Sequence, residues 1–285
     1  MRLAVLSGKG GTGKTFISVN LASVLENALY LDCDVEAPNG RLFFKPENIE
    51  SREIHVKMPK VNHDLCTGCR ICTEFCQFNA MAFVNGQVKI FEDICHSCGG
   101  CSLLCPTNAI EEVDFPIGSI ESGFSEDVDI QSGIMNIGQA SGVPIIGAMI
   151  HDSHTHDGPV VIDCPPGSAC VVMESIKDAD HCLVVAEPTI FGAHNIAMVL
   201  ELTEQMSIPT SVIINKSIGD DHLIEEVCQK CDVEIIASIP FEASLGEING
   251  NGLIATRVNE DYRDLFETLV KTLNLEVPSE AITNS

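Results

Sequence analysis

A glycine-rich segment near the start of the chain constrains its fold most strongly. The residues before it, 2–6, form a short and mainly apolar run, and residues 16–25 after it are apolar at helical spacing. In the order strand, glycine loop and helix, backbone N–H groups can surround an anion and the helix N-terminus adds partial positive charge. We therefore predict a phosphate-binding loop. The segment has the sequence GKGGTGKT and comprises Gly8, Lys9, Gly10, Gly11, Thr12, Gly13, Lys14 and Thr15.

Two interpretations of this loop compete. As a phosphate loop, it would use Lys14 to reach the β- and γ-phosphates of a nucleotide and the Thr15 hydroxyl to hold Mg²⁺. Its glycines also satisfy the G-x-G-x-x-G pattern of dinucleotide-binding folds, with Asp32 or Asp34 about twenty residues further on. The Lys14–Thr15 pair favours the phosphate loop, because a dinucleotide-binding fold has no use for it.

With its second lysine, Lys9, the segment resembles the deviant Walker A motif of the MinD/ParA/Mrp/nitrogenase-iron-protein ATPases. This resemblance implies ATP or ADP with Mg²⁺ as ligands and ATP hydrolysis as the activity. It also implies an ATP-dependent dimer, formed by two identical chains or with a paralogue. In such a dimer Lys9 reaches the phosphates bound by the partner.

Two acidic strand ends match the same family. Residues 28–34 form an apolar strand that ends in acids, and Asp34 resembles the switch I aspartate, which positions or activates the attacking water. Residues 160–163 form an apolar strand that ends in Asp163, a Walker B signal whose carboxylate holds the Mg²⁺ shell through water. The D-x-P-P-G sequence that begins there resembles switch II, which implies that the Gly167 N–H senses the γ-phosphate.

The resemblance also covers the contacts to the base of the nucleotide. It places Asn215 on the adenine ring, with the backbone of residues 240–241 beside it. The expected catalytic residues are Lys9, Lys14 and Asp34. The expected nucleotide-binding residues are Gly8, Gly10, Gly11, Thr12, Gly13, Lys14, Thr15, Gly167, Asn215, Pro240 and Phe241, with Thr15 and Asp163 serving Mg²⁺.

The chain has 14 cysteines, and eight of them form two C-x-x-C-x-x-C-x-x-x-C runs within residues 66–105. This is an internal repeat of the bacterial two-cluster ferredoxin pattern, in which the fourth cysteine of each run binds the cluster of the other run. Four-cysteine zinc sites usually consist of two separated C-x-x-C pairs, so the spacing favours iron–sulfur clusters over zinc. Pro106 follows the second run, whereas Gln77 follows the first. The expected ligands are Cys66, Cys69, Cys72 and Cys105 for one [4Fe–4S] cluster, and Cys95, Cys98, Cys101 and Cys76 for the other.

These motifs predict an α/β protein of the P-loop NTPase class, with a mostly parallel sheet flanked by helices and interrupted by a small α+β ferredoxin-like insert. Residues 1–59 are expected to form the first part of the ATPase domain, 60–114 the insert and 115–285 the second part. Within the insert, short strands are expected at 81–84, 87–90 and 109–113. Outside it, the apolar patterns predict a short strand at 53–57, a helix starting at Val143 and a closing helix over 258–273.

The charge balance excludes several kinds of partner. The 16 Lys and Arg against 41 Asp and Glu give a formal charge of −25, which argues against a nucleic-acid surface and against anionic lipid. No apolar run is long enough to cross a bilayer and no signal peptide is visible, so we expect a cytoplasmic protein without membrane insertion. MinD itself ends in a basic amphipathic membrane helix, and the acidic end of this chain departs from that feature. The acidic residues concerned are Glu260, Asp261, Asp264, Glu267, Glu276 and Glu280.

Three further groups of residues are potential metal ligands, and each has a second interpretation that involves no metal. Cys170 follows switch II at the start of a helix, similar to a cluster cysteine of the nitrogenase iron protein, but it is equally a small buried residue. Cys228 and Cys231 form a C-x-x-C pair on a predicted helix, which cannot complete a four-ligand site alone. The histidine-rich run 151–156 could bind a transition metal or form an exposed loop.

Three functions are compatible with these motifs. The first is an ATPase whose hydrolysis gates electron transfer or the assembly of a metal or iron–sulfur centre, with a redox protein or metalloprotein as client. The second is a non-hydrolysing electron or cluster carrier in which nucleotide is only structural. The third is an NAD-linked iron–sulfur oxidoreductase. ATP hydrolysis distinguishes the first from the second, nucleotide selectivity distinguishes the third, and the sequence does not identify the client.

Overall fold

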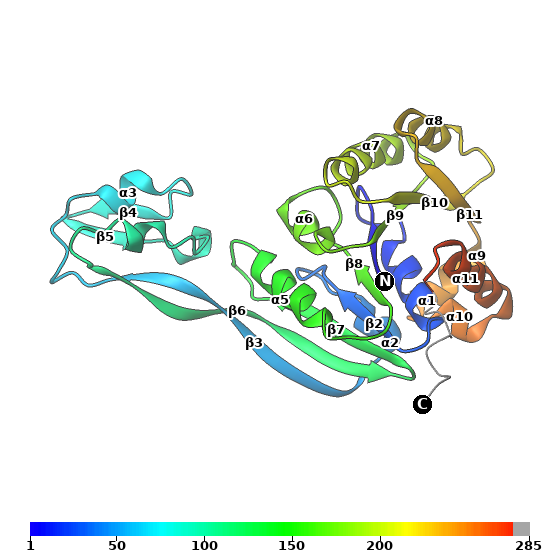
Figure 1. Cartoon of the computed structure of the whole chain (residues 1–285), viewed down its shortest axis with the longest axis horizontal. Helices are drawn as coiled ribbons and strands as arrows, with labels where there is room; N and C mark the ends of the chain where they lie inside the picture. The colour runs from blue at the N-terminus through cyan, green and yellow to red at the C-terminus, as the bar shows by residue number, and fades with distance from the viewer. Residues whose placement is uncertain (276–285) are drawn as a thin grey trace, which may run out of the picture.

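The computed structural model of the chain describes residues 1–275, and most of its strands join one large sheet (Figure 1). The nine strands of this sheet lie in the order β11-β10-β9-β1-β8-β2-β7-β6-β3. Their bounds are β1 (Arg2–Leu6), β2 (Ala28–Asp32), β3 (Glu47–Val61), β6 (Ile110–Ser125), β7 (Val128–Met135), β8 (Val160–Asp163), β9 (His181–Ala186), β10 (Thr210–Ser217) and β11 (Glu234–Pro240). The strands from β11 to β7 run parallel, and β6 and β3 add an antiparallel edge.

Helices cover both faces of the parallel part. One face packs against α5 to α8, and the other packs against α1 and the C-terminal helices. Strands buried on both faces are expected to be continuously apolar, as β1 is. The predicted fold class, an α/β fold with a large mostly parallel sheet flanked by helices, is confirmed. The helices are α1 (Lys14–Ser23), α2 (Gly40–Phe44), α5 (Val143–Ser153), α6 (Cys170–Ile176), α7 (Ile190–Gln205), α8 (His222–Cys231), α9 (Ala243–Gly250), α10 (Ala255–Val258) and α11 (Glu260–Thr272).

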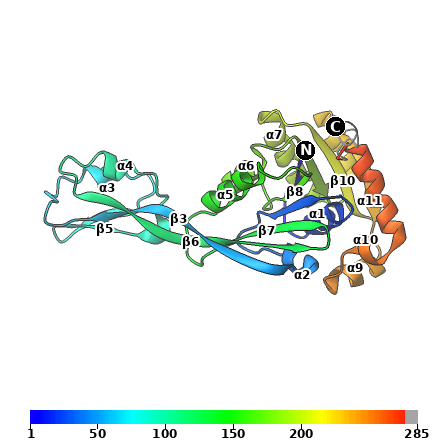
Figure 2. The ribbon, with the colours of Figure 1, turned by 60° about the horizontal axis from the view of Figure 1, so that its bottom comes forward.

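A long antiparallel ribbon of β3 and β6 carries the cysteine-rich insert away from the sheet (Figures 1 and 2). The strand expected at 53–57 is present, but it is not short, because β3 spans 15 residues. Residues 109–113 likewise do not form a separate strand of the insert, since 110–113 begin β6. β3 is largely exposed and polar and β6 is only partly buried, so the apolar periodicity that signals a fully buried strand is missing along much of the ribbon.

The insert itself is small and has a core of its own. The expected hairpin is present, with β4 and β5 paired antiparallel. Cys72, Met81, Val88 and Ile110 form its buried core. Residues 59 and 115 lie inside β3 and β6, so both strands run without a break between the main sheet and the insert. The elements of the insert are α3 (Ile71–Phe75), β4 (Met81–Val84), β5 (Gln87–Ile90), the 3-10 helix η1 (Glu92–Ile94) and α4 (Gly100–Leu103).

The closing helix expected over 258–273 is divided at Asn259. The Asn259 side chain accepts hydrogen bonds from the N–H groups of Asp261 and Tyr262, so it caps α11 and separates it from α10. Glu276 and Glu280, part of the predicted acidic tail, lie outside the described residues. Among the helices of residues 1–275, none combines the length and the apolar character needed to span a membrane.

Candidate functional site

The glycine loop lies between β1 and α1, at the edge where the parallel strands end. Gly13 takes a left-handed conformation with φ of 95° and precedes the first residue of α1, Lys14. A Cβ on Gly13 would lie 2.1 Å from Nδ2 of Asn215, so a larger residue would collide with the neighbouring strand β10. The Thr12 hydroxyl is buried in the loop and has no hydrogen-bond partner within residues 1–275. Buried polar atoms in proteins are normally partnered, by protein, water or ligand, so this hydroxyl is free to accept a ligand in the loop.

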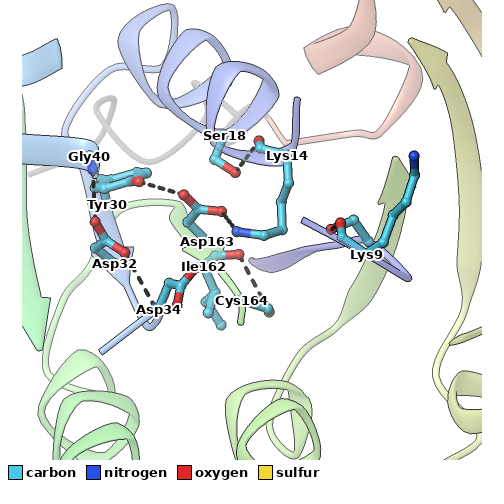
Figure 3. A network of polar contacts seen from close by, with 11 residues as sticks. Lys9, Lys14, Ser18, Tyr30, Asp32, Asp34, Gly40, Ile162, Asp163 and Cys164 are labelled. Atoms are coloured by element: carbon cyan, nitrogen blue, oxygen red, sulfur yellow. Dashed lines mark hydrogen bonds and ion pairs between the residues drawn. The ribbon is translucent and has the colours of Figure 1, made fainter. Parts of the chain in front are cut away.

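Lys14 and Asp163 form a buried ion pair beneath the loop (Figure 3). The Lys14 ammonium donates to Oδ1 of Asp163, and the Tyr30 hydroxyl donates to Oδ2 of the same carboxylate at 2.8 Å. Burial by itself would lower the pKa of Lys14, but the nearby carboxylates, Asp163 above all, raise it above its ordinary value. Lys14 is therefore charged and is available to neutralise an anion placed above it.

Two more aspartates of β2 and its following loop lie near this pair (Figure 3). Asp32 accepts a hydrogen bond from the Gly40 N–H at 2.8 Å and another from the Asp34 N–H at 3.3 Å. Burial, together with the charge of Asp163, raises the pKa of Asp32 to about 7. Asp34 is half-buried and near enough to Lys14 and Asp163 for both charges to influence its pKa, which burial raises. The structure thus gathers the predicted Asp34 with Lys14 of the loop and with Asp163.

Lys9 points to a different partner. Its ammonium contacts Oε2 of Glu187 at 2.6 Å, and Lys216 contacts Oε1 of Glu187 at 3.7 Å while donating to the Gly11 carbonyl at 2.6 Å. Desolvation raises the pKa of Glu187, but the two lysines lower it below its ordinary value in total. No motif in the sequence pointed to Glu187 or Lys216. Both follow or end apolar strands at the edge that carries the loop, and that signal could have found them.

Gly167 has a left-handed backbone with φ of 96°. Its N–H, which was predicted to sense a γ-phosphate, donates to the Ser7 carbonyl at 2.9 Å in this structure. Ser7 directly precedes the glycine loop, so the predicted switch II segment is hydrogen-bonded to the loop's first turn.

A pocket beside the loop contains all the residues predicted to bind the base. Asn215 uses its side-chain amide to donate to the Thr12 carbonyl at 2.7 Å, which ties β10 to the loop. Helix α9 closes the pocket, and no sequence motif had indicated its contribution. The lining residues are Gly13, Phe16, Asn215, Lys216, Pro240, Phe241, Glu242, Leu245, Gly246 and Asn249.

The eight cysteines of the insert line two separate cavities. Each cavity takes three cysteines from one run and the fourth from the other run, the combination expected from the crossed ferredoxin pattern. The cysteines of the first cavity are Cys66, Cys69, Cys72 and Cys105, and those of the second are Cys76, Cys95, Cys98 and Cys101.

The backbone of the two cysteine runs repeats along with the sequence. Each cysteine of the second run stands 29 residues after its counterpart. The left-handed residues repeat with the same offset: Gly68 and Ser97 have φ of 70° and 51°, and Arg70 and Gly99 have 65° and 72°. Two such turns in each run wrap the chain around its cavity in the same way, so the internal repeat holds in the structure and not only in the spacing.

The thiols differ in how readily they become thiolates, the form that binds metal. Desolvation raises the pKa of Cys72, Cys95 and Cys101, that of Cys101 to about 11. At Cys105 desolvation also acts upward, but hydrogen bonds from neighbouring groups lower the pKa in total. The Ala109 N–H, for example, lies 3.2 Å from the Cys105 sulfur. Hydrogen bonds of this kind stabilise negative charge on sulfur.

The three further groups of potential metal ligands, Cys170, the Cys228–Cys231 pair and the histidine-rich run 151–156, do not form a metal site within residues 1–275. Cys170 is exposed at the start of α6, and on α8 Cys228 is buried whereas Cys231 is exposed. His154 contacts Asp178, and His156 bonds to the Asn27 carbonyl. Across residues 1–275, no three His, Cys, Asp or Glu side chains converge on a point where a single metal ion could bind. The cysteine quartets surround cavities instead.

Comparisons with known proteins identify a nucleotide-binding family. The family model described as the CobQ/CobB/MinD/ParA nucleotide binding domain matches residues 3–255. The protein MJ0578 of Methanocaldococcus jannaschii is 31% identical over 278 residues, covering 94% of this chain and 96% of its own. A second protein of that organism, MJ0579, is 27% identical over 224 residues, covering 76% of this chain and 80% of its own.

Among solved structures, the septum site-determining protein MinD of Pyrococcus horikoshii, complexed with Mg-ADP, is similar with a TM-score of 0.59 and 17% identity. The match covers 98% of this chain and 99% of MinD. The ATP complex of McdA from Cyanothece gives a TM-score of 0.58 at 14% identity, covering 98% of both chains. At such identities these likenesses concern the fold. The family model covers most of the chain, however, and the chain belongs to the CobQ/CobB/MinD/ParA family of nucleotide-binding proteins.

Proposed function

We propose that this protein is a cytoplasmic ATPase carrying two [4Fe–4S] clusters, in which ATP-dependent dimerisation gates electron transfer or the assembly of a metal or iron–sulfur centre in a client protein. One observation carries the proposal: a single chain of a nucleotide-binding family also divides eight cysteines between two cavities of four. The client is a redox protein or metalloprotein, and it is not a nucleic acid, given the charge of −25.

The nucleotide half of the proposal rests on Lys14 and its surroundings. MinD of Pyrococcus horikoshii is described with Mg-ADP, and a nucleotide-binding protein of Archaeoglobus fulgidus with ADP. In this chain Lys14 would leave Asp163 and bind the β- and γ-phosphates. Asp163 would then be free to orient the water shell of Mg²⁺, with the Thr15 hydroxyl as a direct ligand. The Gly167 N–H would give up its hydrogen bond to the Ser7 carbonyl and donate to the γ-phosphate instead.

The proposal that the insert binds iron–sulfur clusters is supported by the cysteine thiols that line its two cavities. Thiolate is the ligand that [4Fe–4S] clusters take in proteins, four to a cluster. Apart from the cysteines, the cavities are lined largely by apolar side chains, Val61, Val88 and Ile110 in the first and Phe75, Phe78 and Met81 in the second. When bound, the clusters would supply one-electron transfer. The chain's own contribution is to hold the cysteines, limit water and donate backbone hydrogen bonds to sulfur, as Ala109 does to Cys105.

The way in which the insert is joined to the nucleotide-binding part of the chain supports coupling between the clusters and the nucleotide. Strand β6 leaves the insert and turns into β7, which pairs with β2, the strand that leads to Asp34. The loop after β7 lies close to both sites. The Met135 N–H at its start donates to the Val35 carbonyl at 2.9 Å, and a Cβ on Gly138 would lie 4.0 Å from Oδ1 of Asp93 in the insert.

Replacing Asp34 with alanine should leave ATP binding largely intact and slow hydrolysis by about 100-fold or more, because a group that positions or deprotonates water contributes on that order. Phosphate release by anaerobically prepared protein, compared with equilibrium binding of ATP, measures the two effects separately. Normal hydrolysis by the variant would refute the switch I assignment.

The wild-type protein distinguishes the candidate functions. If it binds ATP without hydrolysing it, the protein is the non-hydrolysing carrier and not an ATPase. A preference for NAD over ATP would favour the oxidoreductase.

ATP should also convert the Asp34→Ala protein to a dimer and shift the potential of at least one cluster. By linkage, reduction of the clusters should then change nucleotide affinity by the same factor. Mass in solution and cluster potentials, measured without nucleotide, with ADP and with ATP, test this expectation. Adding Lys9→Ala should abolish the dimer and spare both clusters. A monomer with identical potentials in all three states would contradict the coupling.

A further inference from the structure

Tyr30 is an unusual residue for its position. It lies in the middle of β2 between Leu29 and Leu31, and its side chain is 0% exposed. A buried hydroxyl requires a hydrogen-bond partner, and that of Tyr30 donates to Oδ2 of Asp163 at 2.8 Å (Figure 3). No motif in the sequence pointed to this tyrosine.

The two oxygens of Asp163 have different partners. Oδ1 accepts from Lys14, whose ammonium would move to the phosphates when a nucleotide binds. Oδ2 accepts from Tyr30, which lies on a central strand of the sheet. After Lys14 has moved, the Tyr30 hydroxyl is the side-chain donor within residues 1–275 that still fixes the orientation of the Asp163 carboxylate.

The hydroxyl of Tyr30 is itself held by the segment that follows Asp34. The Tyr30 ring packs against the Phe44 ring of α2, with centroids 5.0 Å apart. A Cβ on Gly40 would lie 2.3 Å from Cε1 of Tyr30 and 2.4 Å from its hydroxyl oxygen. The Gly40 N–H also donates to Asp32. The start of α2 thus closes over the tyrosine and sets its position.

We propose that Tyr30 is a positioning residue for the magnesium site: it holds Asp163 in the orientation that serves the water shell of Mg²⁺, and it links that carboxylate to the switch I segment through Gly40 and Phe44. This inference rests on the proposed binding of ATP with Mg²⁺. It adds a residue that acts through Asp163 and touches neither nucleotide nor metal.

Tyr30→Phe tests the proposal by removing one oxygen atom and keeping the ring. A hydrogen bond to a charged group is strong enough that its loss should raise the Mg²⁺ concentration for half-maximal ATP binding about tenfold. The affinity for ATP in the absence of Mg²⁺ should change less than about twofold, because Lys14 is untouched. A merely structural loss would weaken both measurements together.

The chain offers a matched control, since it contains two tyrosines. Tyr262 also donates its hydroxyl to a carboxylate, that of Glu242 at 2.7 Å, on the exposed surface. Tyr262→Phe therefore removes the same kind of bond without touching Asp163. Because Glu242 lines the base pocket, this variant can change the affinity for ATP without Mg²⁺, but the Mg²⁺ concentration for half-maximal binding should stay at the wild-type value.

A second variant disturbs the hydrogen bond between Tyr30 and Asp163 without changing either residue. Gly40→Ala forces the Tyr30 ring to move and should raise the Mg²⁺ requirement in the same direction as Tyr30→Phe. A wild-type Mg²⁺ dependence in Tyr30→Phe, with ATP binding intact, overturns the positioning role and leaves the proposed function standing. If the wild-type protein shows no Mg²⁺-dependent ATP binding, the proposed function fails and this inference fails with it.

Discussion

Replacing Lys14 with alanine is expected to weaken binding of ATP with Mg²⁺ at least about a hundredfold. The ammonium is the charge that neutralises the β- and γ-phosphates, and it stands at the first residue of α1, directly below the glycine loop. Equilibrium titration with a fluorescent ATP analogue measures the loss. Lys9→Ala, in the same loop, is the matched control when the protein is too dilute to dimerise, because Lys9 contacts Glu187 within its own chain and its expected role lies at the phosphates bound by the partner.

Lys14→Ala should also lower the stability of the protein, and this loss has to be measured separately from the loss of ATP binding. Without Lys14, the buried Asp163 carboxylate loses its counter-charge, and breaking such a pair costs about 3–5 kcal/mol of stability. Adding Asp163→Asn to Lys14→Ala removes the unpaired charge and should restore much of the melting temperature without restoring binding. If the double variant binds ATP as tightly as the wild-type protein, Lys14 has no role at the phosphates.

Much of the fold could be predicted because its signals are local. Residues 160–162 of β8, which precede Asp163, are all apolar because helices cover both faces of the sheet, and the sequence shows this directly. The glycine loop and the cysteine spacing are also local patterns with a physical reason. The ribbon of β3 and β6 had no such signal. Most residues of β3 are exposed, and the first pair of the ribbon, Glu47 and Phe124, lies 77 positions apart in the sequence.

The side-chain partners within the candidate site could not be predicted for a related reason. Which residue of β2 faces Asp163 depends on the register between β2 and β8, where Tyr30 pairs with Val161 and Asp32 with Asp163. Glu187 meets Lys9 only because β9 lies beside β1. A sequence contains these contacts only through the three-dimensional order of the strands, so motifs identified Lys14 and Asp163 but not the tyrosine that donates to the Asp163 carboxylate.

Replacing Cys76 with alanine is expected to remove the cluster held by Cys95, Cys98 and Cys101, although Cys76 belongs to the other run. In the structure it lines the second cavity together with those three cysteines. Wild-type protein isolated without oxygen should contain about eight irons and eight labile sulfides per chain, and the variant about four of each. Cys105→Ala is the mirror variant and should remove the first cluster instead. Iron near four in fully reconstituted wild-type protein, or stoichiometric zinc, would refute the two-cluster arrangement.

Double variants decide whether the cysteines cross between the runs. If Cys76 serves the second cavity, Cys76→Ala combined with Cys101→Ala damages one cluster twice and should keep about four irons. Cys76→Ala combined with Cys72→Ala damages both clusters and should leave almost none. Uncrossed runs give the opposite result, because Cys72 and Cys76 would then share a cluster. Since the two pairs of substitutions remove the same number of thiols, the iron content depends only on which cavity each cysteine faces.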